Sequence, residues 1–141
     1  MSDHILPRSP RESMNGWVYL PRYVDKIRLH LAGRLHPDYH ENFGRGMDAV
    51  WLQAAGVTHE AMIEAVRGTL TDGEVCDWVR RNIRRTPEEK EAHRHEVMDF
   101  PMPDHAAAQR LFEKRKADYG LSGRADVRTR PDLLDADEGR M

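Results

Sequence analysis

The apolar residues of this chain recur at the spacing of a helix face, and no window alternates apolar and polar residues as a half-buried strand does. Val24, Ile27 and Leu31 follow this spacing in the first such stretch. The pattern predicts short helices, which in residue numbers span 21–32, 48–55, 58–70, 71–83, 87–98 and 104–119.

Polar residues and glycines mark where these helices begin and end. Thr71 and Glu74 match a capping box, in which hydroxyl and carboxylate each accept a hydrogen bond from the other residue's backbone N–H. Thr86 and Glu89 repeat the motif, and Asp48 is expected to cap the helix that it opens. Helix stops are predicted at glycines, namely Gly33, Gly56 and Gly120.

Together these signals indicate an all-α fold, a small irregular bundle of about five or six short helices with ordered N- and C-terminal segments. We expect a single helical domain over residues 1–141, with disorder limited to residues 1–8 and 141. The stretch 17–20 is too apolar for a free tail, so we expect it to pack on the domain.

Composition restricts the partners and the compartment. The formal net charge of −2 leaves no basic excess, which argues against binding to nucleic acid. No apolar run is long enough to span a membrane, and no apolar signal segment is visible at the N-terminus, so no membrane partner is expected. The single cysteine, Cys76, excludes an intramolecular disulfide, and a cytoplasmic location is expected.

Short motifs spread along the chain give a second kind of evidence. They read SPRE at 9–12, GWV at 16–18, LPR at 20–22, DGEVCDWV at 72–79 and DLLDADEGR at 132–140. In combination they resemble DUF5069, a bacterial family of unknown function. The resemblance implies a small single-domain soluble bacterial protein, and it implies no activity, cofactor or catalytic residue.

Opposite charges stand at the two ends of the chain. Arg11, Arg22 and Lys26 lie near the start, with Asp25 among them, and acidic residues close the chain at Asp135, Asp137 and Glu138. One interpretation is a clasp, in which the tail folds back and pairs with the basic residues. The other is a site for a carboxylate or phosphate, because a guanidinium group binds such anions through two parallel hydrogen bonds.

In this anion-site hypothesis, Arg11, Arg22 and Lys26 contact the ligand and Asp25 orients the basic side chains. Trp17 belongs to the same ligand-binding set, because it stands in an irregular segment close to Arg22 and could line a groove.

The loop 34–46 holds the residues that we would expect to carry catalysis. Asp38, Tyr39 and His40 place a carboxylate, a phenol and an imidazole side by side in sequence, and imidazole exchanges protons near neutral pH. Loops on a rigid scaffold often hold active sites. The competing interpretation is a polar connector, and whether the protein is an enzyme stays open at this point.

Metal chemistry receives weaker support. The 8 histidines show no HExxH pattern, although a zinc site assembled from distant histidines is left open. Asp135 and Asp137 begin like a calcium loop, but Gly139 stands where the next ligand belongs. Cys76 is expected to border the core as a small apolar residue rather than to act as a nucleophile. No metal ligand is assigned and no cofactor is expected.

These observations predict a binding module for a small anion such as a carboxylate, or a protein-interaction module, with homodimerisation as a candidate partnership. The ligand pocket is expected between the N-terminal segment, the helix 21–32 and the loop 34–46. The alternatives are a small acid–base or hydrolytic enzyme that uses the His40 and Asp38 pair, or a metal-binding protein.

Overall fold

The computed structural model describes residues 5–141, and seven α-helices form the bulk of this part of the chain. Two short antiparallel strands come first, β1 (Ser13–Met14) and β2 (Trp17–Val18). The helices are α1 (Leu20–Leu31), α2 (Met47–Ala55), α3 (His59–Arg67), α4 (Asp72–Asn82), α5 (Pro87–Met98), α6 (Ala106–Asp118) and α7 (Arg130–Asp137). A 3-10 helix, η1 (Pro37–Tyr39), stands between α1 and α2. The predicted helical fold with ordered terminal segments is confirmed.

The helix α7 was not predicted, so the expected number of about five or six helices is too low for the described residues. Its start is a capping box with aspartate in place of glutamate. The Asp132 N–H donates to the Thr129 hydroxyl over 3.4 Å, and the Asp132 carboxylate accepts from the Thr129 N–H over 3.1 Å. The polar surroundings of Leu133 and Leu134 hid this short helix from the apolar pattern.

Two further expectations need correction. The hairpin of β1 and β2 was not foreseen, although Asn15 and Gly16 have φ values of 51° and 79°, the conformation that a two-residue turn requires. Asp48 does not cap α2, because Gly46 is the residue that precedes the helix and Asp48 lies fully buried in its first turn.

The two predicted capping boxes are confirmed, whereas the residue that precedes α6 is His105 and not Asp104, which was expected to cap that helix. The Thr71 hydroxyl accepts from the Glu74 N–H over 3.2 Å, and the Glu74 carboxylate accepts from the Thr71 N–H over 3.1 Å. Thr86 and Glu89 form the same pair of bonds at the start of α5. Four of the helices therefore begin where a threonine satisfies their first backbone N–H groups, at Thr58, Thr71, Thr86 and Thr129.

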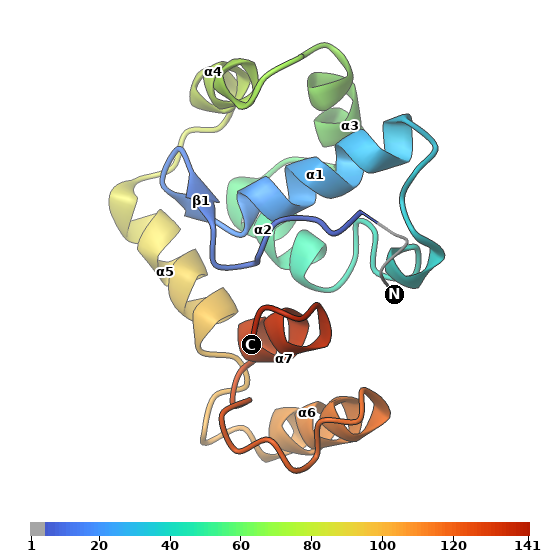
Figure 1. Ribbon diagram of the computed structural model, residues 1–141. Helices are drawn as coiled ribbons and strands as arrows, with labels where there is room; N and C mark the ends of the chain where they lie inside the picture. The colour runs from blue at the N-terminus through green and yellow to red at the C-terminus, as the bar shows by residue number, and fades with distance from the viewer. Residues whose placement is uncertain (1–4) are drawn as a thin grey trace.

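The main core forms around α1 and β2. Trp17, Tyr23 and Trp51 are fully buried there, and the rings of Trp17 and Tyr23 each lie 5.8 Å from the Trp51 ring. Figure 1 shows α1 at the centre of the molecule, where it packs against α3, while α2 packs against α5. Burial of these large rings fixes the direction of α1 and hence of its polar side chains.

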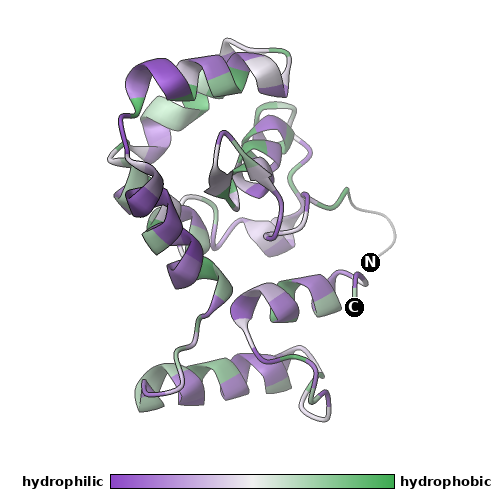
Figure 2. Cartoon of the chain, turned by 90° about the vertical axis from the view of Figure 1, so that its left-hand side faces the viewer, coloured by the Kyte–Doolittle hydropathy of each residue, from purple (hydrophilic) through white to green (hydrophobic). Residues whose placement is uncertain are grey.

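A second, smaller apolar cluster consists of Phe112, Val127 and Leu133, and it holds α6 and α7 together. In Figures 1 and 2, α7 lies between α6 and the rest of the molecule. Figure 2 also shows hydrophilic and hydrophobic residues mixed along the helices. Within residues 5–141 no helix is both long enough and apolar enough to cross a membrane.

Part of the segment expected to be disordered, residues 1–4, lies outside the described residues. Arg8, by contrast, has the ion pairs reported below. The assignment of one domain to residues 1–141 stays a prediction.

Candidate functional site

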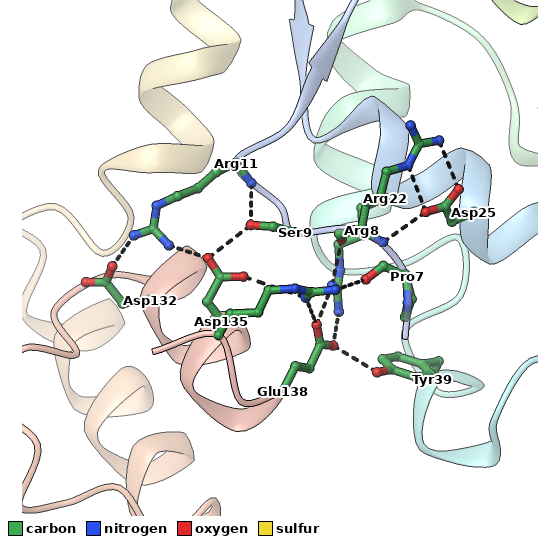
Figure 3. A network of polar contacts seen from close by, with 11 residues as sticks. Pro7, Arg8, Ser9, Arg11, Arg22, Asp25, Tyr39, Asp132, Asp135 and Glu138 are labelled. Carbon is green, nitrogen blue, oxygen red and sulfur yellow. Dashed lines mark hydrogen bonds and ion pairs between the residues drawn. The ribbon is translucent and has the colours of Figure 1, made fainter. Parts of the chain in front are cut away.

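The two ends of the chain are joined by ion pairs (Figure 3). Arg22 Nη1 donates to Glu138 Oε1 over 2.9 Å and Arg22 Nη2 donates to Glu138 Oε2 over 2.6 Å, with both side chains almost fully buried. Burial acts to raise the pKa of Glu138, but the bonds from Arg22 outweigh it and hold that pKa below its ordinary value. Arg11 pairs with Asp132 and Asp135 of α7. These contacts agree with the clasp interpretation.

Arg8 is a member of this network that sequence reasoning missed. Its backbone N–H and its Nε each donate to Asp25 over 2.9 Å, and its Nη1 donates to Asp72 over 2.8 Å. Asp25 therefore orients Arg8 rather than Arg11 or Arg22, as Figure 3 shows. Arg8 stands in a stretch without apolar periodicity, so no local signal distinguishes it from other surface arginines.

Lys26 belongs to a buried polar network beneath the same surface. Its Nζ lies 2.9 Å from Asp48 Oδ2, and the Tyr19 hydroxyl donates to Asp48 Oδ1 over 2.6 Å. The Gly44 N–H also donates to Asp48, over 2.9 Å. Asp48 is thus held by three donors, which explains why it is buried in α2. Burial lowers the pKa of Lys26 despite the neighbouring carboxylate.

Trp17 is placed differently from the other predicted ligand-binding residues. It has no exposed surface, and its ring contacts those of Trp51 and His93 in the core. Trp17 is not one of the described residues that line the cleft beside α1.

A cleft of about 900 Å³ opens between α1, the segment 37–47, α6 and α7. Arg22 and Lys26 of α1 line it together with Asp38 and Tyr39 of η1. The cleft lies where the ligand pocket was expected, beside the N-terminal segment, the first helix and the loop 34–46, and α6 and α7 form its other wall. Its volume lies in the range of about 300–1,000 Å³ that is common for small-molecule sites.

Three arginines from three separate segments line this cleft: Arg45, Arg115 and Arg130. None of them has an ion pair with an acidic residue in the described part of the chain, and the same holds for the exposed Lys114. Arg130 lies over the Phe100 ring at 5.7 Å. Burial, together with the charge of Arg115, lowers the pKa of Arg130.

Acidic residues also line the cleft, at Asp38, Glu41, Asp118, Asp137 and Glu138. Glu138 is engaged by Arg22, and Asp38 lies 3.6 Å from the His36 ring. The charge of Arg115 acts on Arg130, so these two arginines form a local positive centre within a mixed surface.

The candidate catalytic residues point to different partners. His40 Nε2 lies 2.9 Å from the Leu35 carbonyl oxygen, and the Tyr39 hydroxyl donates to Glu138 Oε2 over 2.8 Å. Asp38 is largely exposed, and no hydrogen bond joins it to His40 within residues 5–141. The fold brings Tyr39 to the cleft beside Arg22 and leaves the pair of Asp38 and His40 unassembled.

The remaining candidates lie apart from the cleft. Over residues 5–141 no group of three or more His, Cys, Asp or Glu side chains is placed to hold a metal ion. Cys76 is partly buried on α4. His93 is almost fully buried, and neither of its ring nitrogens has a hydrogen-bond partner among the described atoms.

A family model described as a domain of unknown function (DUF5069) matches residues 4–140, and a search of curated proteins finds no match.

Proposed function

The chain belongs to the DUF5069 family, a domain of unknown function, and we propose that it binds a small carboxylate or phosphate anion in the cleft between α1, α6 and α7. The observation that carries the proposal is the pair Arg115 and Arg130. Both line the cleft, neither has an ion-pair partner within residues 5–141, and the charge of Arg115 lowers the pKa of Arg130.

Two partly buried guanidinium groups close together repel one another, and burial strengthens that repulsion. A bound anion offsets this repulsion between the two guanidinium groups, and its oxygens accept hydrogen bonds from both. Guanidinium groups match carboxylate and phosphate oxygens through parallel N–H donors. Arg45, from the segment 37–47, is a further arginine without an ion-pair partner among residues 5–141 that lines the same cleft.

Arg11 and Arg22, the two predicted anion-binding arginines, support the site rather than contact the ligand. Arg22 already donates hydrogen bonds to both carboxylate oxygens of Glu138, and Arg11 forms ion pairs with Asp132 and Asp135. These pairs hold α7 against α1 and against the N-terminal segment, and Arg130 is the first residue of α7. Lys26 and Tyr39 form part of the cleft wall. The predictions of a homodimer, a bacterial origin and a cytoplasmic location stay predictions.

The proposal is tested by titrating inorganic phosphate and citrate into the protein while heat release or amide NMR shifts are recorded. Arg130→Gln is expected to weaken binding about tenfold or more, since a hydrogen bond to a charged group contributes about 1.5–3 kcal/mol. Arg84→Gln is the matched control, because Arg84 is exposed and lies outside the cleft. Equal affinity in both variants, or no saturable binding in the unaltered protein, contradicts the proposal.

A further inference from the structure

The chain has four lysines, Lys26, Lys90, Lys114 and Lys116, and only Lys26 combines burial with a place in the cleft. It is 3% exposed, whereas Lys114, on the opposite wall, is exposed. Lys90 donates to the Asn15 carbonyl oxygen over 2.9 Å, and Lys116 is buried on α6 but does not line the cleft. The cleft therefore contains one amine held in a fixed, largely dehydrated position.

The surroundings of Lys26 contain the groups that amine chemistry needs. Asp48 Oδ2, at 2.9 Å, can take up a proton from the ammonium group and return it. The Tyr19 hydroxyl holds the other oxygen of Asp48 at 2.6 Å and so fixes the carboxylate. The only other contact of the amine is the Asn42 carbonyl oxygen at 3.4 Å in the described part of the chain. Burial lowers the pKa of Lys26, which increases the share of neutral amine.

We propose that Lys26 forms an imine with the aldehyde or ketone group of a ligand whose carboxylate or phosphate is held by Arg115 and Arg130. The proposal rests on the proposed function, because it uses the anion site as the second point of attachment. It names the ligand class as small carbonyl compounds that carry an anionic group.

The step balances without a further reactant. Asp48 takes one proton from the Lys26 ammonium group, and the neutral amine nitrogen forms a bond to the carbonyl carbon. A second proton moves from this nitrogen to the former carbonyl oxygen, which gives a carbinolamine. Asp48 returns its proton to the hydroxyl, the C–O bond breaks, and water leaves. The product is a protonated imine with the same total charge as the starting ammonium group.

The experiment uses pyridoxal 5′-phosphate, which carries an aldehyde and a phosphate and whose imine absorbs visible light. The full chain is incubated with the probe, reduced with borohydride and digested, and the labelled lysine is identified by mass spectrometry. We expect the label at Lys26, and about tenfold less with pyridoxal, which lacks the phosphate that fixes the probe. Lys26→Arg keeps the ion pair with Asp48 and is expected to abolish the absorbance, whereas Lys90→Arg, outside the cleft, is expected to keep it.

A label on Lys114, or spread over all four lysines, overturns the proposal. So does equal labelling by pyridoxal, since the anion site would then have no part in it. The mapping on the unaltered protein decides the matter even where Lys26→Arg does not fold. Phosphate that binds through Arg130 without any label at Lys26 overturns the imine and leaves the proposed function standing. If the unaltered protein binds no phosphate, the proposed function itself is contradicted.

Discussion

Arg22 and Glu138 form a two-point ion pair between the first helix and the last turn of the chain, 116 positions apart in the sequence. The side chains are 2% and 3% exposed, so water replaces neither partner. The pair fixes the end of α7 against α1, on the wall of the cleft that both helices line. An ion pair that looks structural thus determines the shape of the candidate site.

Removal of one partner of this pair is expected to be strongly destabilising. Glu138→Gln leaves the buried Arg22 without a counter-charge, and the free energy of unfolding is expected to fall by about 3 kcal/mol or more. Urea unfolding followed by circular dichroism measures the change. Asp126→Asn, which removes an exposed pair with Arg124, is the control and is expected to change little. If the free energy of unfolding falls no further in Glu138→Gln than in Asp126→Asn, the pair of Arg22 and Glu138 adds no stability.

The local pattern predicted most helices, because their apolar positions and threonine caps lie within a few residues of each other. It failed for Asp48 because a capping aspartate and a buried one look alike until Lys26 and Tyr19 are placed beside it. It also failed to single out Arg130, which reaches the cleft only because α7 folds back onto α1. Residues brought together by tertiary contacts leave no pattern in a single sequence.

The buried His93 is expected to make stability depend on pH. Burial lowers its pKa from 6.5 to about 4, so the unfolded chain takes up a proton at a higher pH than the folded one. As the pH falls from 6.5 to 4, the free energy of unfolding is therefore expected to decrease by up to about 3 kcal/mol, and this part of the change ends below pH 4.

Urea unfolding at a series of pH values measures this slope. His93→Phe keeps a ring against Trp17, whose centroid lies 5.4 Å from that of His93, and is expected to flatten the slope between pH 6.5 and 4. His105→Phe replaces a histidine that is exposed, and it is expected to keep the slope of the unaltered protein. An unchanged slope in His93→Phe would mean that His93 takes up its proton at the same pH in the folded and the unfolded chain.

The cap of α7 links stability to anion binding. Thr129→Ala removes the hydroxyl that accepts from the Asp132 N–H, and a loss of about 1 kcal/mol of unfolding free energy is expected. Because Arg130 is the next residue, phosphate binding is also expected to weaken. Thr58→Ala removes an equivalent cap from α3, away from the cleft, and is expected to lower stability without changing phosphate affinity. Equal phosphate affinity in both variants would separate α7 from the anion site.

The side chain of His40 distinguishes anion binding from acid–base catalysis in this cleft. His40 Nε2 lies 2.9 Å from the Leu35 carbonyl oxygen, and His40 does not line the cleft formed by the described residues. His40→Ala is therefore expected to leave the rise in melting temperature caused by phosphate or citrate unchanged, while Arg130→Gln removes most of it. Thermal unfolding with and without each anion gives the comparison. A turnover that disappears in His40→Ala, with any substrate, would favour the enzyme hypothesis, because a side chain that only holds a loop does not control the protonation of a reacting group.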